Sequence, residues 1–235
     1  MGKVRISQML ARAGLHLAPT TVRRLARERL RPPPRRPVAR AAPTKRRVVT
    51  AGYPHHVWHI DFTLVPTAAG FWVPWLPFAL PQRWPFCWWV AAVLDHFSRF
   101  IVAHAVFRHE PDAAEVRAML DRAARAAGRA PKYTVTDQGS QFRRRYRRWC
   151  RAHGVRPRFG AVGKCGSIAV IERFWRSLKQ ECLRLIAVPF GRLAMEAEVV
   201  AYLSWYNGSR PHQSLGGATP RERLTGARPA CGRAG

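Results

Sequence analysis

Two isolated acids, Asp137 and Glu172, bracket a strongly cationic stretch of the sequence. The whole chain has only 13 Asp and Glu residues against 41 Lys and Arg residues, so acids retained in this setting need an explanation. Carboxylates are the hard oxygen ligands that Mg²⁺ and Mn²⁺ prefer, and basic side chains bind phosphates. We therefore interpret this stretch as part of a metal-dependent site that acts on nucleic acid.

A third acid, Asp61, lies within a run of β-branched and aromatic residues at 57–64 that predicts a strand. An acid in the middle of a strand is costly unless it is paired, hydrogen-bonded or bound to a metal. By strand alternation Asp61 shares a face with His59 and Thr63. The local pattern leaves two alternatives open, a metal ligand or an outward-facing strand residue. For His59 and His96 we expect packing or hydrogen-bonding roles rather than chemistry.

The elements that would position these acids follow one another in an α/β order. We predict strands at 57–64, 87–95, 100–107, 133–136 and 155–159, and helices at 111–127, 140–153 and 167–186. The second and third strands form an antiparallel meander. Asp137 directly follows the fourth strand, and Ser140 is expected to cap the next helix. This order predicts a mixed sheet with helices packed on it.

The helix predicted at 167–186 carries the last acid. Glu172, Arg176 and Lys179 share one face, because they are spaced i, i+4 and i+7. Its apolar stripe is Ile171, Phe174, Trp175, Leu178, Cys182 and Leu185. Taken alone, an ordinary ion pair between Glu172 and Arg176 is the simpler explanation of the polar face.

Residues 1–30 predict two short helices, the second beginning at Pro19. This arm resembles a partial helix-turn-helix, whose second helix enters the major groove of DNA. Its candidate DNA-binding residues are Thr20, Thr21, Arg23, Arg24 and Arg27. A solvated helical pair with no DNA role is the alternative. A free-standing helix-turn-helix domain packs a further helix ahead of these two. A shortened N-terminus would explain why this helix is not found in the sequence.

The remaining segments differ in composition from the core predicted at 53–225. Residues 31–52 form a basic, proline-rich linker that cannot be helical, because proline lacks the amide donor. The insert at 66–85 contains Trp72, Trp75 and Trp84. These side chains would expose an apolar patch unless covered, so we expect the insert to pack on a second subunit or on DNA. The tail at 226–235 is predicted to be disordered.

The formal net charge of +28 requires an anionic partner. Nucleic-acid phosphates supply one, and an anionic membrane surface is the alternative. A transmembrane helix is not expected, because four prolines interrupt the apolar run at residues 70–94. The five cysteines show no zinc-binding or Cys-x-x-Cys spacing. We therefore expect reduced thiols in a cytoplasmic protein.

Together these residues carry a resemblance. The motifs are Trp58-His59-Ile60-Asp61-Phe62-Thr63, Asp95-His96-Phe97-Ser98-Arg99, Thr136-Asp137-Gln138-Gly139-Ser140-Gln141-Phe142, Ile171-Glu172-Arg173-Phe174, and Tyr206-Asn207 with Arg210-Pro211-His212-Gln213-Ser214-Leu215 and Thr219-Pro220. In this order they resemble the integrase-type core of insertion-sequence transposases, a family related to retroviral integrases. The resemblance runs from about residue 58 to residue 224.

The resemblance implies an α/β, ribonuclease H-like fold, with a mixed five-stranded sheet flanked by helices. It implies that Asp61, Asp137 and Glu172 are both the catalytic residues and the ligands of two Mg²⁺ or Mn²⁺ ions. Lys179, with Arg176 as a companion, would contact DNA near the reacting phosphate. The sequence departs from the family at Gln138, commonly Asn, and at residues 167–170, which replace a motif such as Pro-Asn-Gly.

The implied function is metal-dependent cleavage and strand transfer of double-stranded DNA, between element ends and target, during transposition. The expected setting is a homo-oligomer at the bacterial nucleoid, with no membrane association. Two alternatives remain open. One is a catalytically inactive DNA-binding regulator derived from a transposase. The other is a tyrosine recombinase that uses Tyr206 with Arg210 and His212.

Overall fold

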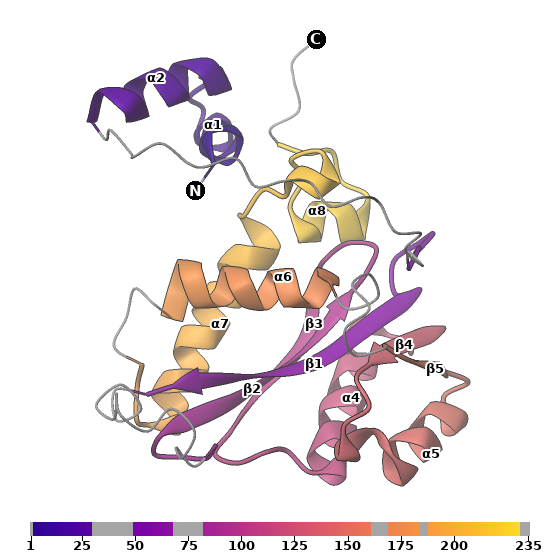
Figure 1. Ribbon diagram of the computed structural model, residues 1–235. Coiled ribbons are helices and arrows are strands. Elements are labelled where there is room, and N and C mark those ends of the chain that lie inside the picture. Colours follow the sequence, from indigo (N-terminus) through magenta and orange to yellow (C-terminus); the bar gives the residue numbers. More distant parts are fainter. Residues whose placement is uncertain (1, 30–48, 68–81, 161–168, 184–187, 231–235) are drawn as a thin grey trace, which may run out of the picture. The chain divides into compact units, whose positions relative to one another are not determined.

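The computed structural model describes residues 2–29, 49–67, 82–160, 169–183 and 188–230 (Figure 1). The chain divides into two compact units. The larger unit is Arg47–Ser204, and the smaller one combines Met1–Arg46 with Trp205–Gly235. Most of the predicted linker at 31–52 and most of the predicted insert, with Trp72 and Trp75, lie outside the described residues.

A five-stranded sheet forms the centre of the larger unit. Its strands are β1 (Val57–Pro66), β2 (Cys87–Asp95), β3 (Ile101–Phe107), β4 (Tyr133–Thr136) and β5 (Arg156–Phe159). Their order across the sheet is β3-β2-β1-β4-β5. The pairs β1–β2 and β2–β3 are antiparallel, whereas β1–β4 and β4–β5 are parallel. The predicted mixed sheet and its antiparallel meander are confirmed.

Helices supply the crossover connections that parallel strands need. Between β3 and β4 lies α4 (Ala113–Ala127), and between β4 and β5 lies α5 (Arg144–Ala152). The first of these begins two residues later than predicted, because the side chain of Asp112 accepts hydrogen bonds from the amides of Ala114 and Glu115 and caps the helix. It ends at Gly128, whose φ of 66° is a left-handed conformation that favours glycine.

The prediction that Ser140 caps a helix running from 140 to 153 is wrong. A 3₁₀ turn at Ser140–Phe142 precedes α5, and no side chain caps that turn or α5. The hydroxyl of Ser140 instead donates to Oε1 of Gln141 at 3.3 Å. The turn has a packing consequence, since it buries Phe142 against the ring of Phe62.

The long helix predicted at 167–186 is also different. The α-helix α6 spans Ala169–Leu178 and continues as one π-helical turn, Lys179–Leu183. Single π turns within helices are rare and often lie at functional sites. This turn leaves Leu183 buried and brings Oε2 of Glu181 to 3.4 Å from the hydroxyl of Tyr202, which donates to it. The last residues of the predicted helix, 184–186, lie outside the described ranges.

The hydrophobic core lies on one face of the sheet. Trp58 and Ile60 of β1 point to this face and pack against α4 and α5. The buried helix residues are Val116, Met119, Leu120, Ala123, Tyr146, Trp149 and Cys150. On the opposite face lies α6, so the sheet is covered on both sides (Figure 1). Successive residues of β1 therefore face the core and α6 in turn, as the predicted alternation required.

The smaller unit joins the two ends of the chain. It contains α1 (Lys3–Arg12), α2 (Pro19–Arg29), the last residues of α7 (Arg192–Gly208) and α8 (Pro220–Thr225). The guanidinium of Arg12 donates to both carboxylate oxygens of Glu222, at 3.1 and 2.6 Å. Glu222 also completes the capping box of α8 with Thr219. One carboxylate thus links the N-terminal arm to the C-terminal helix.

We predict that this link weakens in acid. Burial by itself would raise the pKa of Glu222, but hydrogen bonds from Arg12 and from the amides of Thr219 and Ala230 outweigh burial and lower the pKa from 4.5 to about 2. Because the folded-state pKa is lowered, the stabilisation is fully present above pH 4.5 and is lost as the pH falls toward 2. Glu222→Gln should remove about 2 kcal/mol at neutral pH.

Hydrogen exchange of the amides of α1 and α8 measures this effect locally. The exchange should be faster in Glu222→Gln than in the wild type at neutral pH, and the two proteins should converge toward pH 2. Glu196→Gln is the matched control, since its carboxylate lies 3.9 Å from Arg192 in an exposed pair worth about 0.5 kcal/mol or less. Equal protection of α1 in all three proteins would contradict the prediction.

The cysteines, the longest helices and Trp84 can be compared with the expectations from the sequence. Cys87, Cys150 and Cys182 are free thiols, and Cys165 and Cys231 lie outside the described residues. Among the helices that the structure describes, none is long and apolar enough to cross a membrane. Trp84 is 38% exposed, with the guanidinium of Arg108 4.9 Å from its ring centre.

Candidate active site

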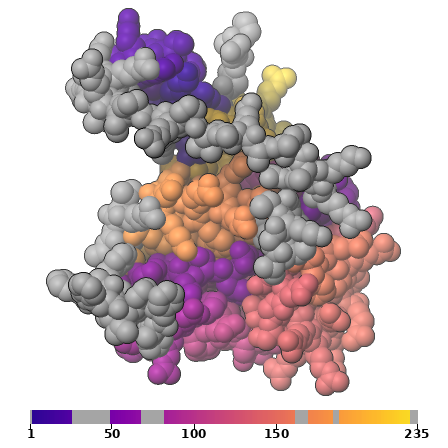
Figure 2. Space-filling model, viewed as in Figure 1, coloured from indigo at the N-terminus to yellow at the C-terminus, as the bar shows by residue number. Residues whose placement is uncertain are grey.

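Asp61 lies in the middle of β1, on the face that α6 covers. Its neighbours along the strand, Ile60 and Phe62, belong to the core on the other face. The carboxylate is held from α6, because Nε1 of Trp175 donates to Oδ2 of Asp61 at 2.9 Å. In the space-filling view α6, in orange, lies directly against β1, in purple (Figure 2). Asp61 is thus a half-buried strand residue whose carboxylate is hydrogen-bonded to α6.

The pKa of Asp61 is raised by the environment of its carboxyl group. Burial raises the pKa of this carboxyl, and the nearby charges of Asp137 and Glu172 raise it further. Hydrogen bonds from the backbone of Phe62 and from Trp175 act in the opposite direction. The balance raises the pKa from 3.8 to about 6. Asp61 is therefore electrostatically coupled to both of the other predicted acids.

Asp137 reaches the site through the pairing of β1 with β4. In the parallel register Val57, Trp58 and His59 lie opposite Tyr133, Thr134 and Val135. Asp61 and Asp137 each lie two residues beyond the last pair of this register, His59 with Val135. A tight turn holds this acid, since the hydroxyl of Thr136 donates to the Asp137 carbonyl oxygen at 2.9 Å and the amide of Gly139 donates to Oδ1 at 3.0 Å. The strand register therefore directs both acids toward the same end of the β1–β4 pair.

Glu172 is positioned by the first turn of α6. Its side chain is exposed, whereas Ile171, Phe174 and Leu178 bury the opposite side of the helix. Trp175 lies three residues after Glu172, so the two share a helix face. The hydrogen bond between Trp175 and Asp61 therefore holds the Glu172 segment close to β1. Sequence reasoning treated Trp175 only as an apolar residue; its place one turn after the acid was the available signal.

In the described residues the three acids are not arranged as a complete metal-binding site. Within the described residues, no group of three or more His, Cys, Asp or Glu side chains is arranged to hold a metal ion. Like charges repel at short range, so carboxylates without a cation between them are expected to stay apart. The donor set nevertheless fits a hard divalent cation, because it consists of carboxylate oxygens and the three acids already interact through their charges.

Comparison with known proteins decides the family. An integrase core domain profile matches residues 52–165, and a second integrase core domain profile matches residues 153–220. The uncharacterized 31.7 kDa protein of insertion element IS407 from Burkholderia multivorans is 31% identical over 224 residues, which cover 94% of this chain and 74% of that protein. The chain belongs to the integrase core domain family.

Relatives and solved structures agree with this assignment. The putative transposase InsK of insertion sequence IS150 from Escherichia coli is 30% identical over 137 residues, 57% of this chain and 47% of that protein. The HTLV-2 integrase catalytic core domain in complex with magnesium superposes with a TM-score of 0.51 at 15% identity, covering 73% of this chain and 97% of that one. A chain of the simian T-cell lymphotropic virus intasome gives a TM-score of 0.61 at 15% identity, covering 88% and 67%. The ribonuclease H-like fold is thereby confirmed.

Two buried histidines of this integrase core contact each other. Nε2 of His59 lies 2.8 Å from Nδ1 of His96, and both side chains are buried. Burial, followed by the charges of His96 and Arg99, lowers the pKa of His59 to about 3. Burial and Arg99 lower the pKa of His96 to about 4. Both imidazoles are therefore neutral at pH 7, and they hydrogen-bond to each other.

The predicted DNA-contacting residues lie on both units of the integrase-type transposase. Arg176 is exposed on α6, and Lys179 is half-buried at the start of the π turn. On α2, Thr20, Arg23 and Arg24 are exposed and Thr21 is half-buried, whereas the side chain of Arg27 lies outside the described ones. Their contacts with DNA stay predictions.

The group considered for a tyrosine recombinase is packed instead. Tyr206, Arg210 and His212 are all buried. The imidazole of His212 meets the ring of Tyr206 edge-on with centres 4.8 Å apart, and the guanidinium of Arg210 lies 5.3 Å from the same ring centre. These contacts make the three residues a packed cluster of the smaller unit.

Proposed function

We propose that this transposase catalyses divalent-metal-dependent cleavage and strand transfer of DNA, with Asp61, Asp137 and Glu172 as its catalytic residues. The main support is the setting of Asp61: burial raises its pKa to about 6, the charges of Asp137 and Glu172 add to that increase, and Trp175 of α6 donates to its carboxylate at 2.9 Å. In the sequence Asp61 and Asp137 are 76 residues apart, and Asp137 and Glu172 are 35 residues apart. The pairing of β1 with β4 and the hydrogen bond from Trp175 of α6 to Asp61 support this grouping.

The three carboxylates would hold Mg²⁺ or Mn²⁺, and we propose two ions. When bound, the ions would activate an attacking water or 3′-hydroxyl and stabilise the departing 3′-oxygen of an in-line phosphoryl transfer. Trp175 orients Asp61 by donating to Oδ2, and Gly139 orients Asp137 by donating to Oδ1. Both bonds leave each carboxylate with further lone pairs for a cation. Arg176 and Lys179 would contact the phosphates of the reacting strand.

The proposed partner is double-stranded DNA, both the element ends and the target. The excess of 41 basic over 13 acidic residues supports a polyanionic substrate. We also propose a homo-oligomer in the DNA complex. Its support is that the HTLV-2 integrase core was solved in dimeric and trimeric forms and that the simian viral relative belongs to an intasome. In transposition, such an assembly would hold two element ends against one target.

The decisive experiment measures end nicking and strand transfer on DNA that carries the termini of the element. We expect activity with Mg²⁺ or Mn²⁺, none with a chelator, and background activity for Asp137→Asn. Asp112→Asn is the matched control, since it removes an acid elsewhere and leaves an N-cap of similar strength on α4. Equal activity of Asp137→Asn and the wild type would rule out the proposed triad.

A further inference from the structure

A cationic hollow lies between α5 and β5, outside the group of acids. It has a volume of about 780 Å³. Its lining residues are Arg144, Arg147, Arg148, Cys150, Arg151, Pro157 and Phe159. Four of these seven side chains are arginines, so the lining is strongly cationic.

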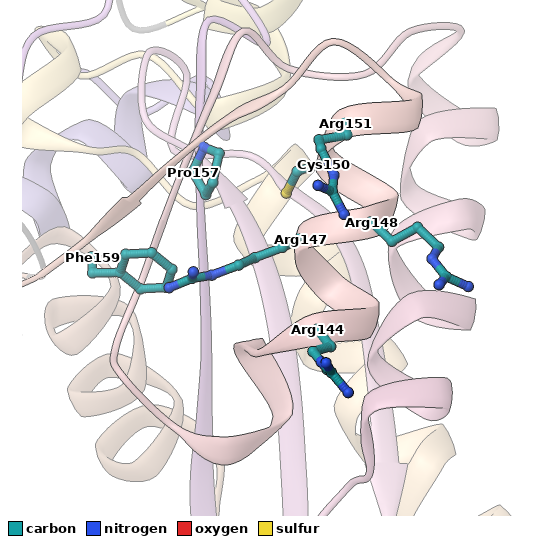
Figure 3. A pocket seen from close by; sticks show the side chains of 7 residues that line it. All are labelled: Arg144, Arg147, Arg148, Cys150, Arg151, Pro157 and Phe159. Carbon is teal, nitrogen blue, oxygen red and sulfur yellow. The ribbon is translucent and has the colours of Figure 1, made fainter.

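The four arginines follow from the helical repeat of α5. They are spaced i, i+3, i+4 and i+7, so they lie along one side of the helix, while Tyr146 and Trp149 are buried on the other. Arg147 extends from α5 toward β5, with its guanidinium 5.3 Å from the ring centre of Phe159 (Figure 3). Arg148 points away from this pair (Figure 3). The hollow is therefore a cationic surface that wraps around one side of the helix.

These charges are not compensated by an acid in the part of the chain that the structure describes. Within the described residues, none of the four arginines forms an ion pair. Between Asp137 and Glu172 the sequence contains eight Arg, one Lys and no Asp or Glu. Like charges on neighbouring helix turns repel each other. An arrangement of this kind is stabilised by an anion that binds from solution.

The length of the row suits an extended anion. From Arg144 to Arg151 the helix rises about 10 Å, at about 1.5 Å per residue. Successive phosphates of a DNA strand advance by about 3.4 Å along the duplex axis, so a row of this length can reach more than one phosphate. Guanidinium groups also suit phosphate oxygens, because they donate two parallel hydrogen bonds. A phosphodiester backbone fits this surface better than a single small anion does.

The hollow is close to Asp137. Phe159 is the partner of Thr136 in the parallel pairing of β4 with β5, and the amide of Gly160 donates to the Thr136 carbonyl oxygen at 2.8 Å. Asp137 is the next residue after Thr136. From the usual strand spacing and Cα separation, the Phe159 and Asp137 backbones are within about 9 Å.

We propose that the hollow between α5 and β5 binds the backbone of the substrate DNA, within a few nucleotides of the phosphate that reacts beside Asp137. The proximity to the reacting phosphate rests on the proposed function. The binding of the DNA backbone by these arginines does not. The two statements can therefore be tested separately.

The test is the salt dependence of binding to a fluorescent DNA duplex, measured by anisotropy. Arg147→Gln combined with Arg151→Gln should weaken binding by about tenfold or more and lower the slope of log K against log salt by about 2, since each phosphate contact contributes about 0.9. Arg147→Lys with Arg151→Lys should keep most of the slope. Arg122→Gln with Arg125→Gln, exposed on α4, removes the same charge elsewhere and should change the slope much less.

The outcomes separate the hypotheses. A wild-type slope in the Arg147/Arg151 variant, or an equal loss in the α4 control, would overturn the inference whether or not the protein cleaves DNA. If the variant has a reduced slope but the wild-type protein fails to cleave DNA with metal, only the proposed function is contradicted. Thermal melting checks folding, and if the first variant does not fold, Arg144→Gln with Arg148→Gln gives the same test on the same row.

Discussion

Replacing Asp61 with asparagine should lower strand cleavage by about 10³-fold or more, which corresponds to about 4 kcal/mol of lost transition-state stabilisation. The same change should make the metal-free protein more stable. Asparagine still presents an oxygen to the indole of Trp175, which now donates to Oδ2 of Asp61 at 2.9 Å. It lacks the negative charge that burial and two neighbouring acids disfavour. Activity and stability should therefore change in opposite directions.

The stability gain should depend on pH. The pKa of Asp61 is raised from 3.8 to about 6 in the folded protein. Its contribution to stability is fully present below pH 3.8 and is lost as the pH rises through 6. Asp61→Asn should thus match the wild type near pH 4 and exceed it by about 1 to 3 kcal/mol near pH 8, without metal.

Melting curves with and without Mg²⁺ or Mn²⁺ measure both effects. A cation that binds the folded wild type raises its melting temperature, whereas Asp61→Asn should respond weakly. Asp121→Asn is a matched control, because Asp121 accepts a similar indole hydrogen bond, from Trp149 at 2.6 Å, away from the acids. It should keep wild-type activity and metal response. An Asp61→Asn protein that melts below the wild type at pH 8 would contradict the electrostatic account.

Trp58→Ala should destabilise the protein by about 3 to 5 kcal/mol. Trp58 is fully buried, packs against α4 and α5, and donates its indole N–H to Nδ1 of His55 at 3.1 Å. Alanine would leave a large cavity in this core and an unpartnered imidazole nitrogen. For a chain of this size each kcal/mol lowers the melting temperature by about 2 to 4 °C, so we expect a fall of about 10 °C.

Thermal and urea unfolding measure this loss. Leu193→Ala is the control, since Leu193 is 82% exposed and should change stability by less than about 0.5 kcal/mol. Trp58→Phe should fall between the two, because it retains most of the ring volume. A melting temperature of Trp58→Ala equal to that of the control would mean that the face of β1 opposite Asp61 does not hold the sheet to its helices.

Local rules predicted the strands and most of the helices. Alternation along β1 predicts that Trp58 and Asp61 lie on opposite faces. In the structure Trp58 packs in the core with α4, and Asp61 contacts Trp175 of α6. The same rules failed at Ser140, where a 3₁₀ turn replaced the expected cap. They also failed after Leu178, where a π turn follows α6. Both failures lie at helix ends, where tertiary packing selects among backbone conformations of similar energy.

The contacts between distant segments could not be predicted. Arg12 and Glu222 are 210 residues apart, and Asp61 and Trp175 are 114 residues apart. Charge and apolar periodicity describe which residues a helix exposes, but they contain no information about which helix meets which strand. The apolar periodicity of α6 accordingly predicts only packing for Trp175, although its indole N–H donates to a proposed catalytic acid.

The sequence by itself determined the kinds of residues and their local positions: an acid within a strand, an acid after a strand, an acid on a helix, and a row of arginines between the last two. These follow from backbone propensity and side-chain alternation, which act over a few residues. Only the tertiary structure decided that Asp61 is half-buried beside the charges of Asp137 and Glu172. It did so because burial and Coulomb interaction depend on distance in space, which strand register and helix packing set.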